Sequence, residues 1–485
     1  MEEVGLEAVK ERSVKGIVAL TTRTFFLQLV NFVGIFLLTI YLSPSVFGIF
    51  YVVSAVISFF TYFSDIGLAA ALIQKKESLT DKDLQTTFTV QQILIITLVV
   101  MIFFFSNRIA KFYNLDHASL TLLQALAFSL LLTSLKTIPS VLLERKLEFQ
   151  KLIIPQVAES VVFNAVAVYL AFKGRGVESF TYAVLARSVV GLVLIYIISP
   201  WKVGLAFSKE SLKRLLKFGL PYQLNSFMAL IKDDLMTIFL GKVIGPAGLG
   251  YLGWSKKWAE APLRFFMDNV IKITFPAYSR LQDNPEKLKK AVGMSLFAIF
   301  SLVLPSIIGL SVVAPVLVQI IPKYIKWEPA ILSLYLFGVS AIWAAISTPL
   351  TNLLNAVGKI KTTFKFMVGW TIATWIFVPV LAIKFGYNGI ALYHALMGFS
   401  GFLVIYVIKK QIDIAIIENI KGPVISSLLM GVFSYFMINL LPHNFPSVMF
   451  IIVTSIIIYF FSLSLADREK TAFALENFRK IFKRQ

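Results

Sequence analysis

Apolar runs of about 20 residues make up most of the chain, and this feature limits the possible folds more than any other. A run of that length lets an α-helix cross the hydrocarbon of a bilayer. Each run has to be helical, because the bilayer core contains no water for unpaired backbone groups. The composition agrees, since 58% of the 485 residues are hydrophobic, 15% are charged and the mean hydropathy is +0.80. We therefore predict an all-α polytopic membrane protein.

Fourteen runs are long enough to cross a membrane. They lie at residues 17–42, 46–73, 86–106, 119–143, 152–173, 178–200, 214–241, 246–276, 291–320, 328–355, 362–384, 388–408, 422–441 and 446–466. The first run is too long for a signal-peptide core and ends without a small-residue cleavage site, so we expect it to stay in the protein. The chain has no cysteine, which excludes disulfides, thiol catalysis and cysteine metal sites.

The basic residues are distributed unevenly between the loops. With a cytoplasmic N-terminus, the inner segments hold 29 Lys and Arg residues and the outer loops hold eight. Cytoplasmic loops of membrane proteins carry such an excess. We therefore predict a multi-pass protein of the cell (inner) membrane with both termini in the cytoplasm. The net charge of +20 then follows from this topology and not from nucleic-acid binding.

A Pro/Gly motif occurs twice, 202 positions apart, at residues 43–50 and 245–252. Chance is the alternative explanation, but weaker matches follow in the same order. Six helices in each repeat give both halves the same orientation, which predicts two parallel repeats about an axis along the membrane normal. The predicted parts are an N-terminal lobe at 1–200, a cytoplasmic amphipathic linker at 201–217, a C-terminal lobe at 218–410, two further helices at 411–466 and a basic cytoplasmic tail at 467–485.

The run at 246–276 carries charges at intervals of four through what should be hydrocarbon. This row, which we call the charged ladder, consists of Lys256, Lys257, Glu260, Arg264, Asp268 and Lys272. A central charge costs roughly 2.5–3.5 kcal/mol to insert, so the ladder either lines a wet cavity or pairs internally through its alternating signs. Four cations against two anions leave an excess of positive charge. We therefore expect a cavity that takes an anionic ligand, with Lys256, Lys257 and Arg264 as candidate ligands.

Charged residues also lie inside other runs. Arg23, about two turns into the first helix, is either an anion ligand or a cation that snorkels to the headgroups. Asp65 either carries a coupling proton or sodium ion or pairs with Arg23. Asp233 and Asp234 stand in a row of three charges, of which at least one needs a partner within the protein.

Other intramembrane residues have a structural explanation as well as a functional one. Aromatic residues near the charges either stack on sugar rings or simply pack, and packing is the better explanation for any single one of Trp254, Trp258, Tyr51 and Tyr62. We expect structural roles for the remaining intramembrane charges and histidine, namely Lys136, Glu159, Arg187 and His394. The GxGxxG pattern at 248–253 starts a membrane helix without a preceding strand, and no Walker A sequence exists, so we predict neither dinucleotide binding nor ATP hydrolysis.

Several short motifs in a fixed order resemble one known family. They are Lys15-Gly16, Pro44 to Gly48, Asp65-Ile66-Gly67-Leu68, Phe112-Tyr113-Asn114, residues 145–149 and residues 275–282. Together they resemble the polysaccharide transporters of the multidrug/oligosaccharidyl-lipid/polysaccharide (MOP) flippase superfamily, which includes Wzx-type exporters of O-antigen and teichuronic acid. The resemblance implies two six-helix lobes in a V, as in the multidrug exporters called MATE, with a central cationic cavity. Arg23 matches a position where related lipid flippases keep a cavity arginine.

The resemblance and the charges lead to one expected function. We expect a flippase, not an enzyme, that moves undecaprenyl-pyrophosphate-linked oligosaccharide from the inner to the outer leaflet by alternating access. In this hypothesis the pyrophosphate binds Arg23, Lys256, Lys257 and Arg264. Pairing or coupling falls to the acidic residues Asp65, Asp233, Asp234, Glu260 and Asp268.

No cofactor or metal is expected, and the energy source is H⁺, Na⁺ or the membrane potential. Expected partners are the lipid-linked oligosaccharide, membrane lipids, and a polysaccharide polymerase or glycosyltransferases. The alternatives are a flippase for a peptidoglycan lipid precursor, a multidrug/cation antiporter of the same superfamily, a membrane-embedded glycosyltransferase or polymerase, and a scaffold.

Overall fold

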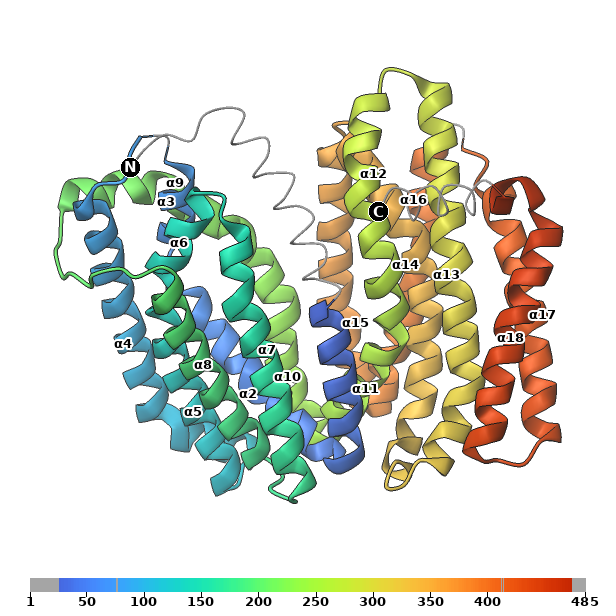
Figure 1. Cartoon of the computed structure of the whole chain (residues 1–485), viewed down its shortest axis with the longest axis horizontal. Coiled ribbons are helices and arrows are strands. Elements are labelled where there is room, and N and C mark those ends of the chain that lie inside the picture. Colours follow the sequence, from blue (N-terminus) through green and yellow to red (C-terminus); the bar gives the residue numbers. More distant parts are fainter. Residues whose placement is uncertain (1–25, 76, 411, 413, 473–485) are drawn as a thin grey trace. The chain divides into compact units, whose positions relative to one another are not determined.

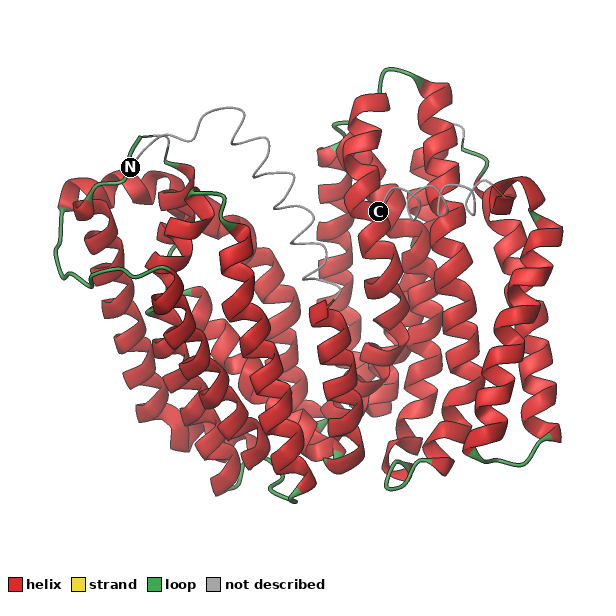
Figure 2. Cartoon of the chain, in the orientation of Figure 1, coloured by secondary structure: helices red, strands yellow, loops and turns green. Residues whose placement is uncertain are grey.

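The computed structural model describes residues 26–75, 77–410, 412 and 414–472. Within these ranges all regular structure is helical (Figure 2). The chain divides into two compact units, Met1–Gly250 and Tyr251–Gln485. The predicted linker at 201–217 lies inside the first unit, while the predicted lobe boundaries themselves stay a prediction.

The first unit is a bundle of long and short helices (Figure 1). In chain order these are Phe26–Tyr41, α2 (Pro44–Tyr62), α3 (Leu68–Gln74), α4 (Asp81–Tyr113), α5 (His117–Ser134), α6 (Thr137–Arg145), α7 (Phe149–Phe172), α8 (Glu178–Ile198), α9 (Lys209–Leu230), the π-helix η1 (Ile231–Leu235), α10 (Met236–Val243) and the start of α11 (Gly245–Pro262).

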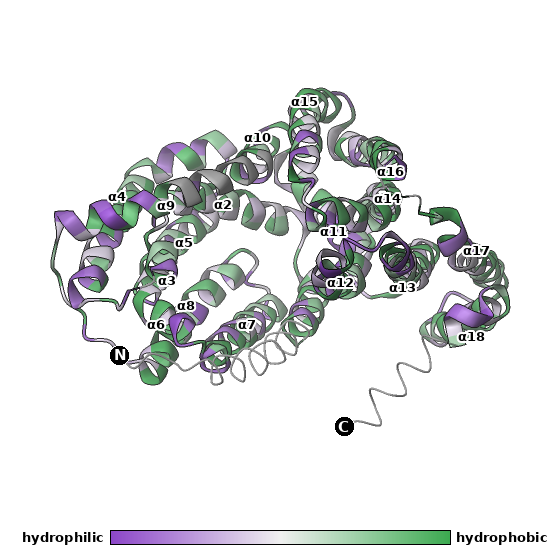
Figure 3. Cartoon of the chain, turned by 90° about the horizontal axis from the view of Figure 1, so that it is seen from above, coloured by the Kyte–Doolittle hydropathy of each residue, from purple (hydrophilic) through white to green (hydrophobic). Residues whose placement is uncertain are grey.

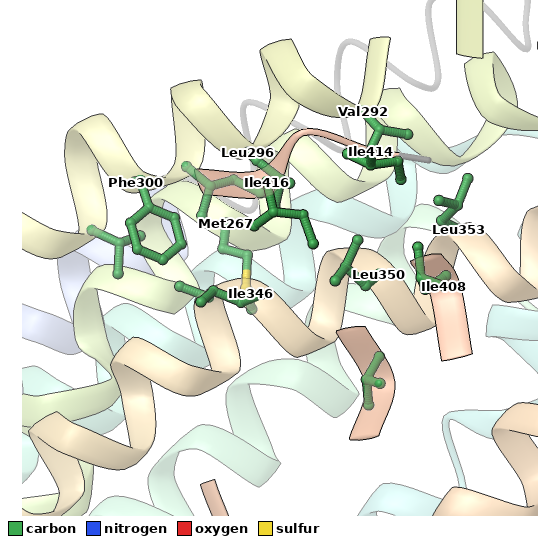
Figure 4. Packing of buried hydrophobic residues seen from close by; sticks show 14 of the residues in the cluster. Met267, Val292, Leu296, Phe300, Ile346, Leu350, Leu353, Ile408, Ile414 and Ile416 are labelled. Carbon is green, nitrogen blue, oxygen red and sulfur yellow. The ribbon is translucent and has the colours of Figure 1, made fainter. Parts of the chain in front are cut away.

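The second unit continues α11 and adds the remaining helices. These are the π-helix η2 (Leu263–Met267), α12 (Asp268–Leu281), α13 (Pro285–Ile320), the 3₁₀ turn η3 (Ile325–Ala330), α14 (Ile331–Ala356), α15 (Ile360–Gly398), α16 (Gly401–Lys409), α17 (Ile416–Leu440) and α18 (Phe445–Ala466). Its largest core joins η2, α13, α14, α16 and the start of α17, with Met267, Leu296, Leu350 and Ile416 among the buried side chains (Figure 4).

Hydrophobic residues predominate along the helices (Figure 3), and many large apolar side chains are exposed. Phe104 and Ile383, for example, are 73% and 71% exposed. Because water would disfavour such side chains, hydrocarbon is the solvent that fits them. The protein is therefore an all-α, multi-pass membrane protein, which confirms the predicted fold class.

Ten helices in the described part of the chain are long and apolar enough to cross a membrane. The count of fourteen is not confirmed, and the difference lies in four places. The first helix is described only from Phe26, and the apolar stretch Ile360–Lys409 counts once although Gly386 (φ 61°) breaks it into two predicted runs. The charged pairs α9–α10 and α11–α12 are each divided by a π-helix and fall outside the ten.

The two copies of the Pro/Gly motif contact each other inside the first unit. Gly48 in α2 lies so close to Pro246 that an added Cβ would overlap the Pro246 carbonyl. Gly250 in α11 has the same relation to the carbonyl of Pro44. The contact is reciprocal between positions that match at a shift of 202, which supports the interpretation of the motif as a true repeat.

Replacing Gly48 by Ala tests this close approach. Alanine normally favours a helix by about 1 kcal/mol over glycine, but here its Cβ would push two backbones apart, and we expect a net loss of about 1–3 kcal/mol. The measurement is unfolding in detergent followed by Trp fluorescence. Gly369→Ala is the control, because this helical glycine has open space around it and should be neutral or slightly stabilising. Equal stability of the two variants would contradict the contact.

A buried aspartate and a nearby arginine join four helices at one end of the first unit. Asp83 in the first turn of α4 is fully buried. Its carboxylate accepts bonds from Lys75 after α3 (2.7 Å), Arg214 of α9 (2.8 Å) and the Thr80 hydroxyl (2.8 Å), which also caps α4. On α6, Arg145 donates to the backbone carbonyls of residues 72, 75 and 77 at the end of α3. These bonds hold α3, α4, α6 and α9 together.

Removing the charge of Asp83 should destabilise the unit. Asp83→Asn leaves Lys75 and Arg214 without their carboxylate, so we expect unfolding to become easier by about 3 kcal/mol. Asp81→Asn, in the same helical turn but exposed, should change stability by less than about 0.5 kcal/mol. Thermal unfolding of both purified variants makes the comparison. A normal melting temperature for Asp83→Asn would show that the buried ion pairs do not stabilise this end.

Candidate functional site

The charged ladder follows α11, η2 and α12, and its course is interrupted by a π-helix. Pro262 has no backbone N–H to donate to the preceding turn, and the next five residues, Leu263–Met267, form the wider turn η2. A π-helical turn within a longer helix is rare and is found frequently at functional sites. Arg264 lies in this turn, between Glu260 of α11 and Asp268 of α12.

Arg264 pairs with both acidic residues of the ladder. Its two terminal nitrogens lie 3.4 Å from an oxygen of Glu260 and 3.4 Å from an oxygen of Asp268. The Arg264 side chain is still 62% exposed, so the pairs are loose and stabilise the fold by no more than about 1 kcal/mol. Internal pairing, one of the two explanations offered for the ladder, thus occurs at its centre.

The lysines of the ladder differ from Arg264. Lys256, Lys257 and Lys272 are exposed, and within the described residues none has a carboxylate oxygen within 4.0 Å. One arginine between two carboxylates leaves a charge of −1, and three lysines then give the ladder its net charge of +2. The positive excess is therefore carried by lysines that no carboxylate of the described chain neutralises, and this is the arrangement that can attract an anion.

The other acidic candidates are separate from the ladder in their local structure. Asp233 and Asp234 lie on the other π-helix, η1. Asp233 is exposed there and Asp234 is half-buried. The Asp65 carboxylate accepts the backbone N–H of Ala69 (3.2 Å) in the first turn of α3. Arg23 and its predicted pair with Asp65 lie outside the described residues.

Asp65 belongs to a break between α2 and α3 that holds α9 close. Ile66 and Gly67 have positive φ angles of 44° and 78°, which turn the chain. An added Cβ on Gly67 would overlap the carbonyl of Gly219 in α9. One turn before the break, the hydroxyl of Tyr62 donates to the Gln223 carbonyl (2.5 Å), and the Gln223 amide donates to the Tyr62 carbonyl (2.5 Å). The motif at 65–68 is therefore a helix junction, and Tyr62 is a packing residue of that junction.

Trp254 also packs instead of facing a ligand. It is buried, stacks on Trp327 with ring centroids 5.4 Å apart, and donates its indole N–H to the hydroxyl of Tyr324 (3.1 Å). Of the two explanations for this residue, packing is the one observed. The sequence distinguishes them poorly, because the partners lie about 70 residues away in the chain.

A second set of intramembrane charges meets inside the first unit. Lys136, at the start of α6, lies 2.6 Å from Glu159 in the middle of α7, and both side chains are largely buried. Glu159 packs directly against Gly191 of α8 and also attracts Arg187, whose guanidinium lies 5.1 Å above the ring of Phe163. Glu159 thus pairs directly with Lys136 and attracts Arg187 electrostatically, a structural role of the kind expected for these residues.

Polar contacts one turn further along α7 join it to the first helix. The Asn31 side-chain oxygen accepts bonds from Asn164 (3.0 Å) and Ser160 (3.2 Å), and Gly34 allows Asn164 to approach closely. Ser160 and Asn164 were not among the candidates predicted from the sequence. Their spacing of four residues on one face of α7, together with Glu159, is the signal that was available.

Comparison with known proteins identifies the family. The family described as "Polysaccharide biosynthesis protein" matches residues 37–331. The chain belongs to this family. Among its relatives are the lipopolysaccharide biosynthesis protein WzxC of Escherichia coli (strain K12), 26% identical over 70% of this chain and 68% of the relative, and the succinoglycan biosynthesis transport protein ExoT of Rhizobium meliloti (strain 1021), 23% identical over 75% and 72%. The predicted resemblance to Wzx-type polysaccharide transporters is thereby confirmed.

Solved structures show that this member of the polysaccharide biosynthesis family has the MOP transporter fold. The lipid II flippase MurJ in an inward closed conformation aligns with a TM-score of 0.73 over 93% of this chain and 99% of MurJ, at 17% identity. An inward-facing MATE family transporter of the MOP superfamily aligns with a TM-score of 0.58 over 82% and 99%, at 16% identity. At these identities the likeness concerns the fold alone.

Glu159 offers a test of the intramembrane charges in this family member. Glu159→Gln leaves Lys136 and Arg187 without a carboxylate, and we expect a loss of stability of about 3 kcal/mol. The double variant Lys136→Gln/Glu159→Gln should recover part of that loss, because the uncompensated lysine is gone. Glu178→Gln is the control, since its pair with Arg175 is exposed and should contribute less than about 1 kcal/mol. Strictly additive effects on the melting temperature would rule out a coupled pair.

Proposed function

We propose that the protein is a flippase that moves undecaprenyl-pyrophosphate-linked oligosaccharide from the inner to the outer leaflet of the cell membrane. The repeat unit belongs to an O-antigen, an exopolysaccharide or a teichuronic-acid-type polymer. The family supports this proposal, and so do relatives named for the biosynthesis of lipopolysaccharide, succinoglycan and amylovoran. These names favour a polysaccharide repeat unit over a peptidoglycan precursor or a drug cation.

The observation that carries the proposal is the charge of the ladder. Lys256 and Lys257 are exposed on a helix of a membrane protein without a carboxylate partner among the described residues. A pyrophosphate group has the opposite charge and would lose most of its hydration in hydrocarbon, so it needs a cationic path. Lysines act as point charges toward phosphate, and an arginine adds directed hydrogen bonds.

The residues then divide into two groups by role. Lys256 and Lys257 attract the pyrophosphate directly, together with Arg23 and with Arg264 after it exchanges a carboxylate for the phosphate. Glu260 and Asp268 hold Arg264 while the site is empty, since both already lie 3.4 Å from its guanidinium.

The remaining acidic residues have other tasks in this proposal. Asp65 keeps the junction before α3 in place, and Asp233 and Asp234 on η1 are the candidates for coupling to H⁺, Na⁺ or the membrane potential. Transport proceeds by alternating access between two lobes and involves no covalent chemistry, cofactor or metal. Both termini lie in the cytoplasm, where glycosyltransferases supply the substrate, and a polymerase uses it on the other side.

Binding of undecaprenyl pyrophosphate, with and without a short glycan, tests the proposal. The purified wild-type protein is compared with Arg23→Gln, Lys257→Gln and Arg264→Gln. We expect each variant to bind about tenfold more weakly, equivalent to roughly 1.4 kcal/mol. Lys323→Gln removes the same charge from an exposed loop and should bind like wild type. If wild type does not bind the pyrophosphate, the proposal fails; if only the ladder variants bind normally, the site lies elsewhere.

A further inference from the structure

The chain between α8 and α9 is extended and lies along the first turns of α4 (Figure 1). One side of this connector is fixed. Trp201 packs edge-on against Phe88 of α4 with ring centroids 5.1 Å apart, and the backbone N–H of Ser208 donates to the Thr86 hydroxyl (3.0 Å). Gly204 lies against α4 so closely that a Cβ there would overlap a glutamine side chain. The connector is therefore held in place over its whole length.

The opposite side of the connector is apolar and exposed. Val203, Leu205 and Phe207 alternate with Gly204 and Ser208, which contact α4, as expected for an extended chain. They are 54%, 76% and 61% exposed. No described side chain covers them, although each is large and hydrophobic. A continuous exposed apolar row of this kind marks a site of interaction with a membrane or with another protein.

Four exposed lysines lie within the connector and in the first turns of the helix that follows it. Lys202 lies within the connector, and Lys209, Lys213 and Lys217 follow at intervals of four, so they share one face of the first turns of α9. All four side chains are exposed. The acidic residue in this stretch is Glu210, which does not balance them, and the nearby Arg214 is already engaged by buried Asp83.

We propose that this surface binds the membrane leaflet at the N-terminal end of α4, with a preference for anionic phospholipids. We call it the connector patch, and it consists of Val203, Leu205, Phe207, Lys202, Lys209, Lys213 and Lys217. Large apolar side chains beside a lysine row are the composition that inserts into a headgroup region containing negative lipids. The cytoplasmic leaflet is the one concerned in the predicted topology.

The position of the connector on α4 fits this occupant. It contacts α4 between residues 85 and 88. These residues stand at the start of the apolar run 86–106, where a membrane-spanning helix enters the hydrocarbon. An apolar row beside lysines at this position is suited to the boundary between headgroups and acyl chains.

A single label at the patch can test the proposal, because the natural chain has no cysteine. The full-length variant Leu205→Cys is labelled with an environment-sensitive fluorophore and placed in nanodiscs of phosphatidylcholine, with or without phosphatidylglycerol. Asp283→Cys, in an exposed loop, is the control label. We expect doxyl-labelled lipid to quench the Leu205 label several-fold more than the control label, and aqueous iodide to quench it several-fold less.

The lysines are tested in the same system. In wild-type background, phosphatidylglycerol should increase lipid quenching of the Leu205 label. The triple variant Lys209→Gln/Lys213→Gln/Lys217→Gln should lose this increase, whereas Lys359→Gln/Lys361→Gln/Lys365→Gln, which removes three exposed lysines elsewhere, should keep it. Quenching by iodide equal to that of the control label would overturn the proposal. Protection from both quenchers would also overturn it, because a protein partner or a second copy would then cover the patch.

Discussion

Charge that is removed from water, in a bilayer or in a protein core, is tolerated only where water or a partner accompanies it, and the arrangement of this protein depends on that constraint. The chain meets it in three ways. Asp83 is completely buried and satisfied by two cations, a hydroxyl and a backbone N–H. Glu159 shares its charge with Lys136 and Arg187. Among the described residues the ladder is balanced only at its centre, by Arg264, and in the proposed function this incomplete neutralisation distinguishes the anion site from charges that hold helices together.

The helix pairs α9–α10 and α11–α12 are each interrupted by a π-helix. Both η1 and η2 widen the backbone where charged residues occur, at Asp233 and Asp234 in one case and at Arg264 in the other. A π-turn rotates the following residues about the helix axis relative to an α-helix, and so it sets which side chains share a face. The loose 3.4 Å contacts of Arg264 are compatible with exchange of its carboxylate partners for a ligand oxygen.

The sequence predicted the fold class and the family, because hydropathy and motif order are local signals. It did not predict the π-turns, because charges that recur at intervals of four fit a continuous α-helix through Pro262. Ion pairing or coupling by Asp65 stays a prediction, and the sequence did not show that its carboxylate also accepts the backbone N–H of Ala69, beside a turn in which Ile66 and Gly67 have positive φ angles. Packing was the better explanation for Trp254 from the sequence, but its partners Tyr324 and Trp327 could not be named because they are remote in sequence.

The reciprocal contact between the two Pro/Gly motifs has a consequence for how such a chain evolves. Identical subunits related by a two-fold axis make contacts of this form, in which each surface meets a copy of itself. A fused duplicate inherits that interface inside one polypeptide, with Gly48 facing Pro246 and Gly250 facing Pro44. The two halves can then diverge in their charged helices, as the ladder of one half illustrates. A substitution in either motif, by contrast, has to fit the backbone of the other motif.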